Sequence, residues 1–132
     1  MQGLTLDTGA LLALERGNKR MRIALQAAHQ DGRIITVPAP VLVEWWLGGQ
    51  GRQRQILDSL ELEPLADPLA KLACEGLSAV MPSSPNGPRP SAIDAVVMAS
   101  AAQRGDIVYT SDVDDLELLR SYLQAVHKVL RV

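Results

Sequence analysis

Four acidic residues are spaced along the sequence so that each stands where a strand ends or a helix begins. They are Asp7, Glu44, Asp94 and Asp112. Because the carboxyl ends of parallel strands meet at one edge of a sheet, side chains far apart in sequence are expected to converge there. Ionised carboxylates brought together repel one another, and a divalent cation between them removes that cost. The spacing therefore predicts a cation site, and oxygen ligands without clustered His or Cys favour Mg²⁺ or Mn²⁺ over zinc.

Each of these residues also has a purely structural interpretation. Asp7 and Asp112 precede helical segments and are typical N-caps, and Ser91 with Asp94 has the pattern of a capping box. Glu44 alone is explained equally well as a solvated helix residue. However, Asp7 follows an apolar strand, and Glu44 and Asp94 interrupt apolar runs, so we expect these carboxylates to lie in apolar surroundings. Taken together, the four positions favour a shared site.

The elements that must position these residues follow from the apolar pattern. Short apolar runs alternate with segments of helical periodicity, which is typical of an α/β domain with a largely parallel sheet. Strands are expected at Leu4–Leu6, Ile34–Val37, Leu62–Leu65, Ile107–Tyr109 and Val126–Leu130. Helices are expected at Thr8–Arg16, Lys19–His29, Val41–Leu47, Arg52–Leu60, Pro68–Val80, Ala92–Arg104 and Val113–Leu123. Glycines at 17, 32 and 48–49 are expected to cap helices, and segment 82–90, rich in Pro, Ser and Gly, to be a loop.

Length and composition restrict the class of protein. The 132 residues fit one domain, 1–132, with an aliphatic core that lacks Phe. The formal net charge of -2 excludes a strongly basic nucleic-acid binder, so any such contact must be local or metal-mediated. Cys74 is the one cysteine, which excludes an internal disulfide, and we expect it to be a small buried side chain. No apolar run is long enough to cross a bilayer, so we expect a soluble, cytoplasmic protein.

The acidic motifs resemble those of the PIN-domain family. The segments that carry the resemblance are Leu6–Leu14, Val43-Glu44, Ile93–Ala101 and Val108–Asp112, in the family's order. They extend over nearly the whole chain, and its size is most similar to the VapC-type ribonuclease toxins of bacterial VapBC toxin–antitoxin systems. The resemblance implies a single PIN-like α/β domain whose central parallel sheet has the strand order 3-2-1-4-5 and is flanked by helices.

The same resemblance implies a function. It is that of an endoribonuclease toxin, a hydrolase that depends on Mg²⁺ or Mn²⁺ and cuts RNA phosphodiester bonds with a metal-activated water. The implied catalytic and metal-binding quartet is Asp7, Glu44, Asp94 and Asp112. Asp115 is a further candidate metal ligand, with Asp114 as the alternative. Thr110 and Ser111 are candidates to hold a carboxylate or a metal-bound water, or only to form hydrogen bonds within the turn. The implied partners are RNA, a VapB-like antitoxin and a second copy of the chain, with no membrane.

Alternative functions remain to be weighed. Asp7-Thr8-Gly9 matches the catalytic tripeptide of aspartic proteases, but those enzymes are all-β at this point and a helix is expected here. A phosphoacceptor receiver domain is disfavoured because Asp7 stands alone where a receiver has paired acids. A PIN-like RNA-processing nuclease without a toxin role and a non-catalytic PIN-like binding module both stay open.

Several other side chains invite a functional interpretation. Trp45 and Trp46 adjoin Glu44, and consecutive helical residues point about 100° apart, so we expect one in the core and one at a subunit or antitoxin surface. His29 and His127 have no partner that suggests acid–base catalysis and are expected at the surface. Candidate contacts to phosphate are Arg16, Arg20, Arg22 and Arg89, the last at the rim of a substrate site.

Overall fold

The computed structural model describes residues 2–46, 51–81 and 85–132, and one five-stranded sheet runs through them. Its order is β3-β2-β1-β4-β5, and each pair of neighbouring strands is parallel. The strands are β1 (Leu4–Leu6), β2 (Ile35–Pro38), β3 (Glu61–Glu63), β4 (Ile107–Thr110) and β5 (Lys128–Arg131). The predicted α/β class and the order 3-2-1-4-5 are confirmed.

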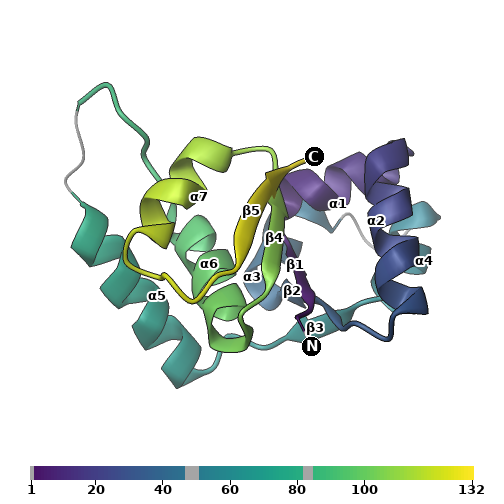
Figure 1. The fold of residues 1–132 in the computed structure, drawn as a ribbon, viewed down its shortest axis with the longest axis horizontal. Coiled ribbons are helices and arrows are strands. Elements are labelled where there is room, and N and C mark those ends of the chain that lie inside the picture. Colours follow the sequence, from purple (N-terminus) through teal and green to yellow (C-terminus); the bar gives the residue numbers. More distant parts are fainter. Residues whose placement is uncertain (1, 47–50, 82–84) are drawn as a thin grey trace.

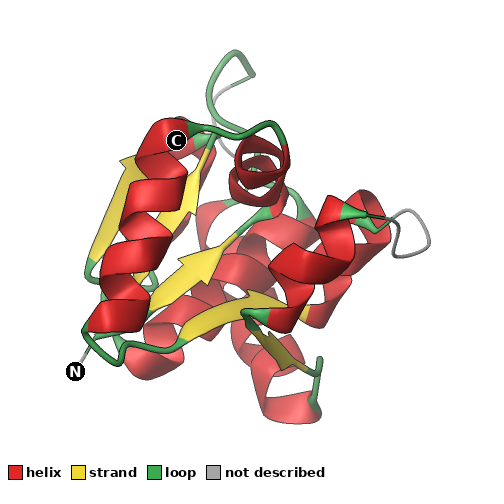
Figure 2. Ribbon diagram, turned by 90° about the vertical axis from the view of Figure 1, so that its right-hand side faces the viewer, coloured by secondary structure: helices red, strands yellow, loops and turns green. Residues whose placement is uncertain are grey.

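Helices cover both faces of this sheet. They are α1 (Thr8–Glu15), α2 (Lys19–Gln30), α3 (Ala39–Trp45), α4 (Arg52–Asp58), α5 (Asp67–Val80), α6 (Ala92–Arg104) and α7 (Val113–Arg120). Figure 1 shows α5, α6 and α7 on one side of the strands and α1, α2 and α4 on the other. The same layers can be followed in Figure 2, where helices flank the central strands. The predicted helices are therefore confirmed, with bounds that shift by up to three residues.

The largest shift is at the end of the chain. Helix α7 ends at Arg120 rather than Leu123, and β5 begins at Lys128 rather than Val126. The Arg120 guanidinium donates to the carbonyl oxygens of Val126 and His127, at 3.0 and 2.7 Å, and so holds the intervening turns against the helix end. Val126 is apolar because it is buried in the core, although it is not part of the strand.

Two of the predicted capping glycines are confirmed. Gly17 and Gly32 have φ of 78° and 70°, a conformation that a residue with a Cβ adopts only with strain. The prediction that a helix reaches Leu47 is wrong, because α3 ends at Trp45 and Trp46 is extended. The predicted cap at Gly48-Gly49 and positions 82–84 of the predicted loop lie outside the described ranges. Residues 85–90 of that loop contain neither helix nor strand.

The core is aliphatic, as predicted, and α6 lies at its centre. All seven residues from Ala95 to Ala101 are buried, which explains the nearly continuous apolar run. Trp45 is 1% exposed, so the expectation that one of the pair lies in the core is confirmed. Trp46 is partly buried against the core, and its place at a subunit or antitoxin surface stays a prediction. The prediction for Cys74 is wrong: it is exposed on α5, because the buried face of that helix carries Leu69, Ala73 and Gly76.

His29 and His127 are exposed, as expected. No helix in the described part of the chain is both long enough and apolar enough to span a bilayer.

Candidate functional site

Asp7 is the most deeply placed of the predicted site residues. It follows β1 and caps α1, with Oδ1 accepting the N–H of Ala10 at 2.9 Å. Oδ2 accepts the hydroxyl of Thr110 at the end of β4. The residue is only 5% exposed, and this burial raises its pKa to about 6. The hydrogen bonds from Thr110 and Ala10 oppose the rise, while the negative charges of Asp94 and Asp112 add to it.

Thr110 connects two of the acidic positions. Its hydroxyl donates to Asp7 and also accepts the backbone N–H of Asp112 at 2.8 Å. Asp112 occupies the N-cap position of α7, but its carboxylate makes no capping hydrogen bond and the residue is exposed. Thr110 therefore holds the carboxylate of Asp7 and also bonds within the turn. The carboxylate of Asp112 is left available to a ligand from outside.

Asp94 has the predicted capping box at the start of α6. Its carboxylate accepts the N–H of Ser91 at 2.8 Å, and its own N–H donates to the Ser91 hydroxyl at 3.1 Å. Partial burial raises the pKa of Asp94, the two bonds with Ser91 oppose the rise, and the charges of Asp115 and Asp112 reinforce it. The acidic groups therefore interact electrostatically although they lie far apart in the sequence.

Glu44 reaches the site from α3. Its Oε1 accepts the hydroxyl of Thr8 at 2.6 Å, which connects α3 to the first turn of α1. The expectation that all these carboxylates lie in apolar surroundings is wrong for Glu44, which is exposed. The apolar run around Glu44 did not indicate burial, because α3 buries Val41 and Trp45 but leaves Val43 and Glu44 exposed.

The predicted acidic residues meet in one cleft of about 420 Å³ at the carboxyl ends of the central strands. Its acidic lining consists of Asp7, Glu44, Asp94, Asp112 and Asp115. Asp114, the alternative to Asp115, is not part of this lining. Oδ1 of Asp115 accepts the backbone N–H of Arg89 at 2.9 Å, and Arg89 is the cation among the described residues around the cleft.

Sequence reasoning identified Ser91 as the capping partner of Asp94, but it missed the part that Thr8 and Gly9 play in arranging these acids. Thr8 and Ser91 line the cleft and hold Glu44 and Asp94. Gly9 lies against Ser111: a Cβ on Gly9 would come 2.9 Å from the Cβ of Ser111, so only glycine fits without a shift. The Asp7-Thr8-Gly9 tripeptide was the available signal, although its resemblance to proteases pointed elsewhere.

The donor set fits a hard divalent cation, but it is not a finished cage. In the described ranges, no group of three or more His, Cys, Asp or Glu side chains is arranged to hold an ion directly. Mg²⁺ commonly binds through one or two carboxylates and keeps several water ligands, so the cleft fits an ion held partly through water.

The sheet order and the carboxylate-lined cleft define a PIN-like α/β fold. The chain has a TM-score of 0.67 with a structure described as DNA-bound VapBC from Salmonella typhimurium, at 14% identity over 99% of this chain and 98% of that one. The TM-score is 0.69 with a structure of VapBC2 from Rickettsia felis bound to a promoter DNA fragment, at 13% identity over 98% of both chains. The TM-score is 0.62 with a structure of FitAB bound to the IR36 DNA fragment, at 19% identity over 97% of this chain and 94% of that one.

These likenesses confirm the resemblance to PIN domains at the level of the fold. No protein-family model matches the sequence, and no curated protein matches it.

Proposed function

We propose that this chain is a metal-dependent endoribonuclease and the toxin of a toxin–antitoxin pair. The observation that carries the proposal is the cleft in which five carboxylates converge from the ends of β1 and β4 and from α3, α6 and α7. The described VapBC and FitAB complexes, whose chains share this fold, support the toxin role. We also propose that residues 1–132 act as one domain and work in the cytoplasm.

The metal centre we propose uses Mg²⁺ or Mn²⁺. When bound, such an ion activates water and stabilises the charge that develops on a phosphate under attack. Asp7, Glu44, Asp94 and Asp112 hold it directly or through water, and Asp115 assists. Thr110 fixes Asp7 and the backbone of Asp112, while Thr8 fixes Glu44, so hydroxyl groups set the orientation of the acids. A divalent cation also brings a polyanionic substrate into a cleft that would otherwise repel it.

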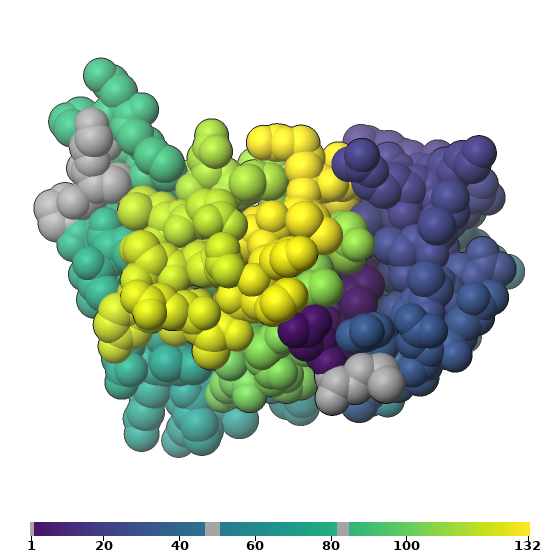
Figure 3. All heavy atoms as spheres, in the orientation of Figure 1, coloured from purple at the N-terminus to yellow at the C-terminus, as the bar shows by residue number. Residues whose placement is uncertain are grey.

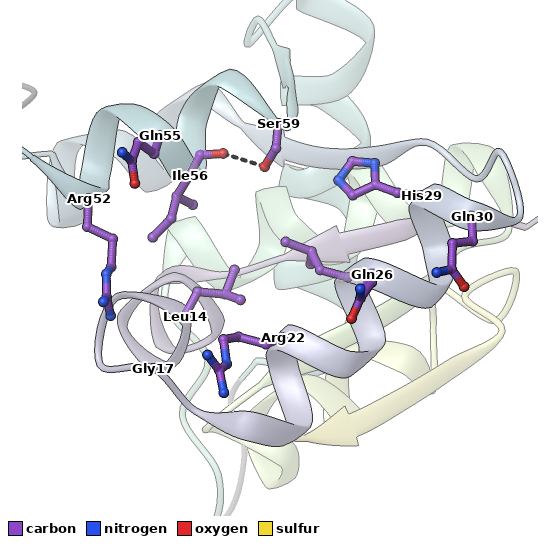
Figure 4. A pocket seen from close by; sticks show the side chains of 11 residues that line it. Leu14, Gly17, Arg22, Gln26, His29, Gln30, Arg52, Gln55, Ile56 and Ser59 are labelled. Carbon is purple, nitrogen blue, oxygen red and sulfur yellow. Dashed lines mark hydrogen bonds between the residues drawn. The ribbon is translucent and has the colours of Figure 1, made fainter.

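A separate groove supports the proposed antitoxin partner. It has a volume of about 550 Å³ and lies between α2 and α4, at the end of α1. Figure 4 shows Leu14 and Ile56 directed into the space between the helices, with Arg22 and Arg52 near Gly17. The charged lining residues are both arginines, so the groove fits a segment with apolar and acidic side chains. We assign this surface to the antitoxin rather than to RNA.

A second copy of the chain is the remaining proposed partner. Large apolar side chains are exposed among the described residues, with Val43 85% exposed and Ile34 59% exposed. Contact between two copies would cover apolar surface of this kind.

The test is a comparison of Asp94→Asn with Asp114→Asn. Asn retains an oxygen that can cap α6 but loses the charge that binds a cation, so the Asp94 variant should fold and lose Mg²⁺-dependent RNA cleavage. Asp114 lies on α7 outside the cleft, and Asp114→Asn removes the same charge as a matched control. Cleavage of total cellular RNA is measured with Mg²⁺, Mn²⁺ or chelator, and circular dichroism monitors the fold.

The outcomes separate the functions that the sequence left open. Wild-type cleavage that survives Asp94→Asn at every Mg²⁺ concentration would falsify the carboxylate mechanism. A folded wild-type protein that binds RNA and never cleaves it favours the non-catalytic binding module. If the protein cleaves RNA but no antitoxin that binds it is found, an RNA-processing nuclease without a toxin role is favoured.

A further inference from the structure

A second cavity adjoins the carboxylate cleft and continues along α1 toward the end of that helix. It has a volume of about 410 Å³. Three residues, Gly9, Leu12 and Ser111, line both cavities, so the two spaces are neighbours that share one wall. Beyond this wall the second cavity is bounded by Arg16 and Val132, which belong to the end of α1 and the end of β5. Figure 3 shows the yellow C-terminal residues against the purple N-terminal helices on this side of the molecule.

The charge of the second cavity is opposite to that of the cleft. None of the described residues lining it is acidic, and its charged side chain is Arg16. Arg16 is exposed, and its guanidinium makes no hydrogen bond or ion pair with the part of the chain that the structure describes. Two further exposed arginines connect to this wall in sequence: Arg131 donates to the carbonyl oxygen of Ser111 at 3.1 Å, and Arg20 donates to the carbonyl oxygen of Arg131 at 3.4 Å.

This contrast has a direct meaning for a polyanionic strand. A phosphate in the carboxylate cleft needs a cation between it and the protein, whereas a neighbouring phosphate can bind an arginine directly. Because the net charge of the chain is -2, attraction of the backbone must come from such local groups and not from the protein as a whole. An arginine next to an acidic cleft also fixes the direction in which the strand crosses it.

We propose that the second cavity is a phosphate subsite for single-stranded RNA, which binds the phosphate next to the one that is cleaved. Arg16 is the direct contact, and Arg131 and Arg20 add positive charge at the rim. This inference rests on the proposed ribonuclease function, because it takes the carboxylate cleft as the place of cleavage. Arg16 positions the strand and takes no part in the chemical step.

The experiment measures binding and cleavage of a fluorescent single-stranded RNA by wild type, Arg16→Ala, Arg16→Lys and Arg16→Glu. Binding is followed by fluorescence anisotropy in Ca²⁺, with a gel to verify that the RNA stays intact, and cleavage is followed in Mg²⁺. Lys71→Ala is the control, because it also removes one exposed positive charge, but from α5, and Lys71 lines neither the carboxylate cleft nor the second cavity. Circular dichroism verifies the fold of each variant.

Loss of the contact should change binding and leave the chemical step intact. Arg16→Ala should raise Kd and KM by about tenfold to a hundredfold, as expected for one hydrogen bond to a charged group, with kcat unchanged. The slope of log Kd against log salt concentration should become shallower by about 0.7, the value for one phosphate on a single strand. Arg16→Lys should keep that slope, Arg16→Glu should weaken binding further, and Lys71→Ala should match wild type.

The two proposals fail in different ways. If the Arg16 variants bind RNA with the affinity and salt slope of wild type, or if wild type does not bind RNA at all, the phosphate subsite is refuted. If wild type binds RNA through Arg16 but never cleaves it in Mg²⁺ or Mn²⁺, the subsite stands and the ribonuclease function fails.

Discussion

Replacing Asp7 with Asn should stabilise the metal-free protein while removing its response to metal. Asp7 is 5% exposed, and its pKa is raised to about 6, so its ionised form is less favourable in the folded chain than in the unfolded one. Asn has the same shape and keeps an oxygen for the N–H of Ala10. Its amide group can donate to the Thr110 hydroxyl oxygen in place of the present bond. The substitution therefore removes the charge with little loss of local hydrogen bonding.

The size and sign of the effect follow from linkage. A pKa raised from 3.8 to about 6 corresponds to about 3 kcal/mol of unfolding free energy, which is an upper limit for the gain. Below pH 3.8 the carboxyl is protonated in both states and costs nothing. Between the two values the folded state holds the proton more tightly, so stability falls as the pH rises. Above about pH 6 the group is ionised in both states and the full cost remains.

The assay is urea unfolding of wild type and Asp7→Asn from pH 4 to 8, with chelator and with Mg²⁺. In chelator, the variant should be more stable than wild type at pH 7.5, and the difference should shrink toward pH 4. Mg²⁺ should raise the stability of wild type, because it binds the folded state and relieves repulsion among the carboxylates, and it should raise that of the variant less. Asp114→Asn, an exposed change of the same charge outside the cleft, should show neither effect.

Two results would refute this reasoning. If Asp7→Asn is no more stable than wild type in chelator at pH 7.5, ionised Asp7 is not destabilising in the folded protein. If the Mg²⁺-induced gain is the same in both proteins, and also in Asn or Gln variants of the other acids, the cation binds elsewhere.

Three further outcomes follow from the same structure. Gly9→Ala should lower the free energy of unfolding in urea by about 1–3 kcal/mol and reduce cleavage, because the new Cβ would come 2.9 Å from the Cβ of Ser111. Unchanged stability would show that the Ser111 loop moves freely. Asp106→Ala should lower the free energy of unfolding by about 3–5 kcal/mol, because Asp106 is 1% exposed and accepts from Thr5 at 2.8 Å and Arg104 at 2.9 Å. A decrease of less than about 1 kcal/mol would contradict this. Light scattering should give a homodimer, and the product of an adjacent reading frame should copurify; a monodisperse monomer or a chain purified alone would remove the respective partner.

Sequence reasoning predicted the fold well because hydrophobic period and helix-stop signals were in agreement. Helix α6 shows this agreement: a capping box begins it at Ser91, its interior is apolar, and Gly105 ends it with φ of 71°. The apolar pattern predicts that α7 ends at Leu123 and that β5 begins at Val126, and both bounds are wrong. Both side chains are apolar because they are buried in the turns between these two elements. Periodicity does not separate these two causes.

The buried polar contacts could not be predicted from the sequence. Asp106 accepts from the backbone of Gly3 and from Thr5 and Arg104, and Arg104 also pairs with Glu63 at 3.0 Å. These contacts join β1, β3, β4 and the end of α6, and they depend on which strands are neighbours. An acid before a strand has no periodic signature, so it was not distinguished from a surface charge.

The candidate site was predicted residue by residue, yet the two interpretations of its acids were treated as alternatives. The structure shows that they are compatible. A carboxylate has about four lone-pair positions, so Asp7 can cap α1 with one oxygen and retain capacity for a cation, and Asp94 can do the same at α6. The capping bonds also orient these oxygens at helix N-termini before any ion arrives. Substitutions that keep the caps and remove the charge are therefore the variants that distinguish binding from folding at this site.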